Sequence, residues 1–313
     1  MSKFDRLSVY AVLLASGLAL FACRGRQTKD KYTDTATSGF ISISADESFR
    51  RIVQQEIDVF ESIYTMAGID PIYASEVDAI NLLLKDSVRL TVSTRRLTDA
   101  EKAGLEEKKF FPKEFKVASD AIALIVNRQN PDSIISLKDL SRILTGEVTE
   151  WSELYPGSKL GKLQLVFDNP NSSTVRYAID SICRGRPLAG SLHAQKSNAE
   201  VIDFVSQSPS AIGVIGVSWV GSESDSTNLS FSDRVTVMAV SREEKATEQN
   251  SYKPFQAYMA LGDYPLMRDV YVILTDPRSG LASGFSTFLA SDRGQRIILR
   301  AGLMPATQNV RIV

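Results

Sequence analysis

Histidine and cysteine are scarce in this chain of 313 residues, which contains one histidine, His193, and two cysteines, Cys23 and Cys183. Zinc sites are built mainly from clusters of Cys and His, and a Ser-His-Asp triad needs a histidine beside its serine. The sequence contains no such cluster, and we expect His193 to be a surface or cap residue. We therefore expect no catalytic residues, no metal site and no other cofactor.

An excess of charge of one sign is also missing. The chain has 36 Lys and Arg against 37 Asp and Glu, which gives a formal net charge of -1. Surfaces that bind nucleic acid are usually basic, so a nucleic-acid partner is not expected. Hydrophobic residues make up 43% and charged residues 23%, as in an ordinary globular protein, and the length permits one large domain or two.

The N-terminus is typical of a targeting segment. A short basic region precedes an apolar stretch at residues 7–22, which is shorter than the roughly 20 residues that a transmembrane helix needs. The stretch ends in Leu20-Phe21-Ala22-Cys23, which resembles a bacterial lipobox, in which the cysteine is lipidated and becomes the first mature residue. We expect residues 1–22 to be a lipoprotein signal peptide and Cys23 to anchor the protein to a membrane of the cell envelope. The alternative is an uncleaved anchor or an ordinary signal peptide.

Residues 23–38 are expected to form a flexible tether, because the stretch after Cys23 is polar and has no periodicity. If Cys23 carries lipid, Cys183 has no cysteine left with which to form an intramolecular disulfide. Cys183 continues the apolar side of a helical pattern that begins at Val175, so we expect it in the core.

Strand and helix patterns alternate along the rest of the chain. Apolar runs at residues 40–43, 69–73 and 88–92 predict strands, and helical spacing predicts helices between them. Further strands are expected at 121–126, 163–167, 211–217, 235–240 and 270–274, and further helices at 198–206, 284–289 and 294–299. This order predicts an α/β fold with mostly parallel sheets.

Small hydroxyl residues follow the first three predicted strands. They are Ser48, Ser75 and the pair Ser93-Thr94. In open parallel sheets, ligands bind beyond the carboxyl ends of the strands, so we expect these side chains to converge.

Three more hydroxyl residues, Ser172, Ser173 and Thr174, lie where a helix should begin after the strand at 163–167. A single hydroxyl is enough to cap a helix, and a cap is the simpler interpretation. Three hydroxyls, together with the free N–H groups and the positive end of the helix dipole, favour a site for a small oxyanion.

Several motifs taken together resemble one family, the phosphate-binding proteins of bacterial ABC transporters. The resemblance covers roughly residues 39 to 313 and depends on the order and spacing of the motifs. These are Leu144-Thr145-Gly146 with Trp151, Ser172-Ser173-Thr174, Ile212-Gly213, Tyr264-Pro265-Leu266 and the run from Phe288 to Gln295.

The resemblance implies a two-lobed periplasmic-binding-protein fold of type II, with a ligand cleft between the lobes. Residues 39–119 and 263–313 would form the first lobe, and residues 120–262 the second. It further implies a monomeric protein that captures inorganic phosphate and delivers it to an ABC permease. Two alternatives stay open: binding of another oxyanion such as sulfate or molybdate, and a phosphate sensor that signals to a membrane partner.

Ligand residues can be carried over from the family only in part. Ser48-Phe49 matches the first loop, Ser75 the second, and Ser172-Ser173-Thr174 the helix start, with Ser173 in place of a glycine. Asp168 stands where the family has an arginine, and Thr94 where it has an aspartate.

These two departures lead to a hypothesis that the charges have exchanged sides. Arg95 or Arg96 would then supply the cation that grips the anion, and Asp168 would accept the hydrogen of a protonated phosphate. The simpler interpretation of both arginines is that they are solvated surface residues.

Overall fold

The computed structural model describes residues 34–190, 193–221 and 230–308. The predicted signal peptide and the lipidation of Cys23 therefore fall outside the described residues. At the end of the predicted tether, the Asp34 carboxylate accepts a hydrogen bond from the Leu281 backbone N–H at 2.8 Å.

The described elements follow the alternation that the sequence predicts. The strands are β1 Ser38–Asp46, β2 Met66–Ala74, β3 Leu90–Ser93, β4 Lys113–Val126, β5 Ile134–Ser136, β6 Gln164–Phe167, β7 His193–Ala194, β8 Ala211–Gly216, β9 Thr236–Val237, β10 Ala239–Ser241, β11 Ser251–Tyr252, β12 Met267–Leu274 and β13 Met304–Pro305. The α-helices are α2 Arg50–Ile63, α3 Glu76–Leu84, α4 Asp99–Glu107, α5 Leu137–Leu144, α6 Ser173–Tyr177, α7 Asn198–Gln207, α8 Gln256–Leu261, α9 Leu281–Ala290 and α10 Asp292–Arg300. Shorter helical turns are η1 Glu47–Phe49, η2 Trp151–Glu153 and η4 Val217–Trp219, and α6 continues as the π-helix η3 Ala178–Ile182.

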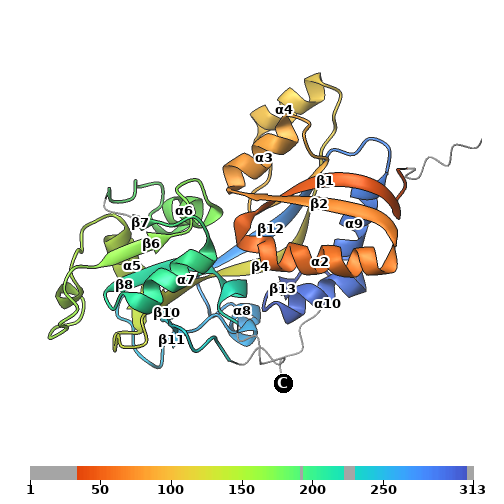
Figure 1. The fold of residues 1–313 in the computed structure, drawn as a ribbon. Helices are drawn as coiled ribbons and strands as arrows, with labels where there is room; N and C mark the ends of the chain where they lie inside the picture. The colour runs from red at the N-terminus through yellow and green to blue at the C-terminus, as the bar shows by residue number, and fades with distance from the viewer. Residues whose placement is uncertain (1–33, 191–192, 222–229, 309–313) are drawn as a thin grey trace, which may run out of the picture. The chain divides into compact units, whose positions relative to one another are not determined.

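One mixed sheet connects most strands in the order β2-β1-β3-β12-β4-β8-β6-β7, with β13 and β9 also paired to β4 (Figure 1). A separate small sheet has the order β11-β10-β5. The predicted parallel pairing is found between β1 and both β2 and β3, and between β6 and both β7 and β8. The sheet is less parallel than the sequence predicts, because β12 and β4 run antiparallel to their main-sheet neighbours.

The long strand β4 joins two groups of strands. Its residues up to Ala121 pair with β12, where Ala121 lies opposite Met267, and from Ile122 onward it pairs with β8, where Ile122 lies opposite Gly216. We call β1, β2, β3, β12 and β13 the first strand group, and β6, β7, β8 and β9 the second. This change of partner lies next to residue 120, at which the sequence predicts a lobe boundary.

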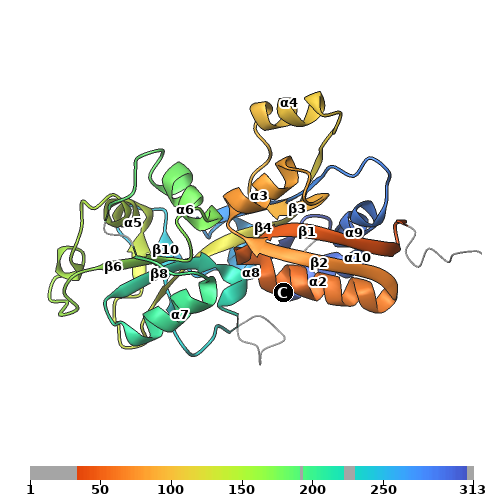
Figure 2. The same ribbon diagram turned by 45° about the horizontal axis from the view of Figure 1, so that its top comes forward.

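Helices cover both faces of the first strand group. In Figures 1 and 2, α3 and α4 lie on one side of β1 and β2, and α2 and α10 lie on the other. Apolar residues of α2 recur at helical spacing and point inward, and Phe60 packs edge-on against both Phe285 and Phe288 of α9 with ring centroids 5.3 Å apart. Burial of this amphipathic face is the main source of stability for such a helix.

The second strand group is packed against α5, α6 and α7 (Figure 1). Cys183 is buried in this core with a free thiol, as the helical pattern predicts. His193 is exposed. Among residues 34–190, 193–221 and 230–308, no helix has both the length and the apolar character needed to cross a membrane.

Candidate functional site

A buried ion pair lies where the two strand groups meet. Arg268 of β12 and Asp120 of β4 are both almost fully buried, and the Arg268 Nε and Nη2 atoms each lie 2.8 Å from Asp120 Oδ2. Arg268 Nη1 also donates to Ser173 Oγ at 2.6 Å, which connects the pair to the start of α6. Burial alone would lower the pKa of Arg268, but Asp120 and Asp46 outweigh it and raise that pKa, so the guanidinium remains charged.

The three predicted hydroxyls lie together at the start of α6, and all are buried. Ser172 caps the helix by accepting from the Val175 N–H, and its Oγ lies 2.7 Å from Thr174 Oγ1. Thr174 Oγ1 donates to Asp168 Oδ1 at 2.7 Å. The predicted cap and the predicted cluster of hydroxyls are thus both present, and Asp168 faces into the cluster.

Several buried polar atoms near this cluster have no hydrogen-bond partner among the described residues. They are Asp46 Oδ2, Ser48 Oγ, Asp120 Oδ1 and Asn198 Oδ1. Buried polar groups are normally paired, so unpaired atoms gathered at one place indicate capacity for a polar ligand. They come from separate parts of the chain: the end of β1, η1, β4 and the start of α7.

Asp46 illustrates the electrostatics of the site. Burial raises the pKa of its carboxyl to about 6, although the charge of Arg268 and a hydrogen bond from Ser173 lower it. The nearby carboxylates Glu76 and Asp168 raise it further. The site therefore combines one buried cation with more carboxyl groups than that cation can neutralise.

Contacts between the two strand groups surround the site. Asn198 at the start of α7 donates through Nδ2 to Glu47 Oε2 at 2.6 Å and to Asp168 Oδ2 at 3.2 Å. Trp219 Nε1 donates to the Ser48 carbonyl oxygen at 2.8 Å. Burial raises the pKa of Glu47 to about 7, against the effect of its hydrogen bonds from Asn198.

Some predicted ligand residues come together here. The Ser172, Ser173 and Thr174 hydroxyls adjoin Asp168, while the backbone N–H of buried Ser48 bonds to Asp46 Oδ1. Phe49 lies under Arg268, whose guanidinium carbon is 5.3 Å from the centre of the ring.

Other predicted residues are engaged in different contacts. Ser75 caps α3 and donates to Asp78 Oδ2, and Thr94 Oγ1 donates to Glu76 Oε1. Arg95 binds Glu101 with both terminal nitrogens at 2.8 Å, which holds its guanidinium against α4.

Arg96 stacks over the Tyr271 ring at 5.0 Å. Neither Arg95 nor Arg96 has a contact with the hydroxyl cluster among those found in the described part of the chain. The ligand roles of all the predicted residues remain predictions.

Sequence reasoning missed the cation that does lie at the cluster. Arg268 follows the Tyr264-Pro265-Leu266 motif and is in phase with the buried residues Val270 and Val272 of β12. The available signal was a charged residue at a strand position that alternation places toward the core, because such a residue needs a buried partner. Asp120, the partner, directly precedes the buried apolar run 121–126 of β4 and gives the same signal.

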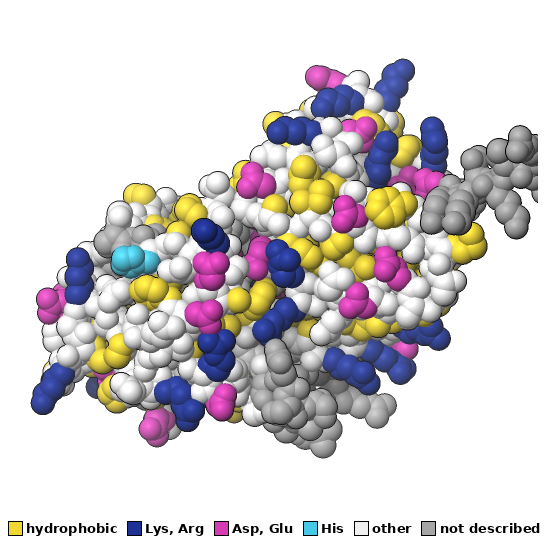
Figure 3. Space-filling view, in the orientation of Figure 1, with side chains coloured by type: hydrophobic (Ala, Val, Ile, Leu, Met, Phe, Trp, Pro, Cys, Tyr) yellow, Lys and Arg dark blue, Asp and Glu magenta, His cyan; other side chains and the backbone are white. Residues whose placement is uncertain are grey.

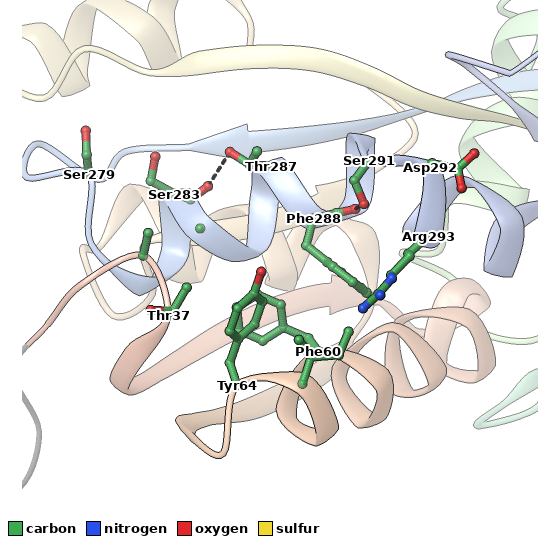
Figure 4. A pocket seen from close by; sticks show the side chains of 13 residues that line it. Thr37, Phe60, Tyr64, Ser279, Ser283, Thr287, Phe288, Ser291, Asp292 and Arg293 are labelled. Atoms are coloured by element: carbon green, nitrogen blue, oxygen red, sulfur yellow. Dashed lines mark hydrogen bonds between the residues drawn. The ribbon is translucent and has the colours of Figure 1, made fainter.

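A cavity of about 710 Å³ lies elsewhere, beside α2 and α9. Phe60 and Tyr64 line one side of it, and Phe288 lines the other together with Ser283 and Thr287 of α9 (Figure 4). Thr287 Oγ1 donates to the Ser283 carbonyl at 2.9 Å, so this hydroxyl is already used within its own helix. Among the described residues that line it there is no buried cation, which makes this cavity a poorer oxyanion site than the Arg268 cluster.

The PBP superfamily domain matches residues 30–293, most of the chain. A phosphate-binding protein PstS of Pseudomonas aeruginosa is 24% identical over 299 residues, covering 88% of this chain and 86% of that protein. A phosphate-binding protein PstS of Bacillus subtilis is 25% identical over 314 residues, covering 96% and 94%.

Solved structures show the same fold. A candidate phosphate ABC transporter substrate-binding protein from Clostridium perfringens, with bound phosphate, superposes with a TM-score of 0.71 at 20% identity, covering 86% of this chain and 100% of that one. An ABC-type phosphate transport receptor from Vibrio cholerae has a TM-score of 0.64 at 20% identity, covering 85% and 100%. The predicted resemblance and fold class are confirmed, and the chain belongs to the PBP superfamily.

Proposed function

We propose that this protein captures inorganic phosphate at the Arg268 cluster and delivers it to an ABC permease. The observation that carries the proposal is the contact of a buried Arg268 with Ser173, beside buried polar atoms that lack partners. The relatives named as phosphate-binding proteins support this choice of ligand. Arg268 takes the place of Arg95 as the proposed cation, because Arg95 is held by Glu101.

The energetics of this site are sufficient for capture. Micromolar binding needs about 8 kcal/mol, and each hydrogen bond that involves a charged group contributes roughly 1.5–3 kcal/mol. Thr174 Oγ1 already donates to Asp168, and Arg268 with the hydroxyls of Ser172 and Ser173 would reach that amount near the upper end of this range. The cluster does not depend on a strongly basic surface, and acidic and basic side chains are mixed over the face shown in Figure 3.

The carboxyl groups favour phosphate over sulfate. Asp46 and Asp168 are buried beside the hydroxyl cluster, and a carboxylate there can accept a hydrogen bond only from a ligand that carries a proton. Phosphate carries at least one proton at neutral pH, whereas sulfate carries none. A carboxylate facing sulfate would add repulsion without a hydrogen bond in return.

The remaining parts of the proposal are those implied by the family resemblance. Residues 39–119 with 263–313 and residues 120–262 would form two lobes that close on the ligand, as a monomer. Cys23 would carry the lipid that anchors the protein in the cell envelope. We assign the chain no catalytic role.

Calorimetric titration tests the proposal. The protein is unfolded, dialysed to remove bound ligand, refolded and titrated with phosphate and then with sulfate. Phosphate is expected to bind at micromolar concentration or tighter, and sulfate is expected to give no heat. Absence of phosphate binding by the refolded protein would refute the proposal.

Variants locate the binding site. Ser173→Ala is expected to weaken phosphate binding about tenfold, because it removes a hydroxyl that would donate a hydrogen bond to the charged phosphate. Ser152→Ala, at an exposed serine, is the matched control. Arg268→Met should abolish binding, whereas Arg95→Ala should leave the affinity unchanged; the opposite result would restore the hypothesis that Arg95 is the cation.

A further inference from the structure

A buried carboxylate, Glu76, joins the two strand groups at a point beside the proposed site. Glu76 is the first residue of α3, and its side chain is 1% exposed. Its Oε1 accepts from Ser93 Oγ at 3.0 Å, from the Thr94 N–H at 2.8 Å and from Thr94 Oγ1 at 2.6 Å. These contacts fix Glu76 to the end of β3, within the first strand group.

Arg176 reaches Glu76 from the other side. It belongs to α6, which follows β6 of the second strand group, and α6 lies beside α3 in Figures 1 and 2. Arg176 Nε lies 2.5 Å from Glu76 Oε2, and its Nη2 donates to Thr94 Oγ1 at 2.7 Å. Thr94 thus donates to Glu76 and accepts from Arg176. We call Glu76, Thr94 and Arg176 the clasp.

The clasp is held by charge. Burial would raise the pKa of the Glu76 carboxyl, but the hydrogen bonds and charge of Arg176 and the hydrogen bonds from Thr94 outweigh it and lower that pKa. Glu76 is therefore an anion at neutral pH. A buried anion is stable only beside its partner, so separation of the two groups at this point is unfavourable.

The clasp is also connected to the proposed ligand site. Arg176 lies three residues after Ser173, whose hydroxyl contacts Arg268, and one turn after the helix cap Ser172. A movement of α6 away from Arg268 therefore also withdraws Arg176 from Glu76. Two contacts from other elements, Asn198 to Glu47 and Trp219 to Ser48, join the same two groups.

We infer that the clasp holds the two strand groups closed over the bound oxyanion, with Glu76 and Arg176 as positioning residues that set how long phosphate stays bound. This inference rests on the proposed function. The clasp residues act through α6 rather than on the ligand, so their loss leaves the hydroxyl cluster and Arg268 in place. The expected effect is faster dissociation of phosphate with little change in its association rate.

The test measures the association and dissociation rates of radiolabelled inorganic phosphate with the full chain, its variants and a control. Glu76→Gln and Arg176→Gln are each expected to raise the dissociation rate at least about tenfold, and the double variant no more than the worse single variant. Arg186→Gln, which removes an exposed pair with Glu147, is the matched control. Unchanged dissociation rates in folded variants would overturn the inference.

A milder variant covers the possibility that the charge changes prevent folding. Thr94→Val keeps the shape of the side chain and removes the hydroxyl between Glu76 and Arg176, and a dissociation rate several times higher is expected. A loss of phosphate affinity of the same size that comes from slower association would contradict the clasp and indicate a damaged site.

Small-angle scattering without ligand separates the two proposals. The wild type should be more compact than the clasp variants even when no phosphate is present. Failure of the wild type to bind phosphate would refute the proposed function. Equal compactness of the ligand-free wild type and the variants would overturn the clasp, whether or not the wild type binds phosphate.

Discussion

Glu56 is a buried acid in an apolar part of the core, and its ionisation should control how stability depends on pH. It lies on α2 between the buried residues Val53 and Ile57 and is 0% exposed. Neither carboxyl oxygen has a hydrogen-bond partner in the described part of the chain. The side chain borders a cavity of about 30 Å³ whose other lining residues, among them Phe49 and Leu289, are all apolar.

Burial raises the pKa of Glu56 from 4.5 to about 9. The folded protein then keeps this proton up to about pH 9, whereas the unfolded chain releases it above 4.5. Because unfolding releases a proton between these values, the free energy of unfolding falls as pH rises, by about 1.4 kcal/mol per pH unit. At pH 8 the loss amounts to about 5 kcal/mol, a large share of the stability of a typical domain.

Replacement of Glu56 by Met, an apolar side chain of similar volume, should remove this cost. The gain in free energy of unfolding over wild type is expected to grow by about 3 kcal/mol between about pH 5.5 and pH 8. Urea denaturation at the two pH values measures it. Asp58→Asn, at an exposed acid on the same helix, should show no such growth.

Comparison of the stability gain at the two pH values shows whether ionisation of Glu56 or packing is responsible. A gain of the same size at both pH values would mean that Glu56→Met acts through packing alone. In that case the carboxyl would ionise without cost in the folded protein, and the reasoning from its unpaired oxygens would be wrong.

Two further predictions concern the ligand site and the core. Phosphate affinity should fall as pH rises from about 5.5 to 8, because Glu47, with a pKa raised to about 7, loses its proton and adds negative charge near the anion. Titration calorimetry should show a shallower fall for Glu47→Gln, and equal slopes would exclude a role for Glu47. Gly213→Ala should destabilise the fold by about 1–3 kcal/mol, because the added methyl would meet Val201 and Val205 at 2.8 and 2.9 Å. Thermal unfolding measures this loss, and an unchanged melting temperature would show that these side chains move aside.

The order of strands and helices was predictable from the sequence because it depends on local patterns. The helical spacing at Ile52, Val53 and Ile57 and the apolar run at 121–126 each record which face of one segment is buried. The cap at Ser172 is equally local, since the hydroxyl and the N–H that it accepts from lie three residues apart. The antiparallel course of β12 and β4 was not predictable in this way, because strand direction depends on how distant segments pair.

The arrangement of charges in the site was decided by the tertiary structure. Arg268 meets Asp120, 148 residues earlier in the chain, only because β12 and β4 pair in a register that places them opposite each other. Arg95 follows a predicted site residue directly, yet Glu101 on α4 holds its guanidinium. Periodicity shows that a residue faces inward, but not which residue it meets. The sequence alone therefore determined the elements, the family resemblance and the hydroxyl cluster, whereas the pairing of distant strands determined which cation serves that cluster.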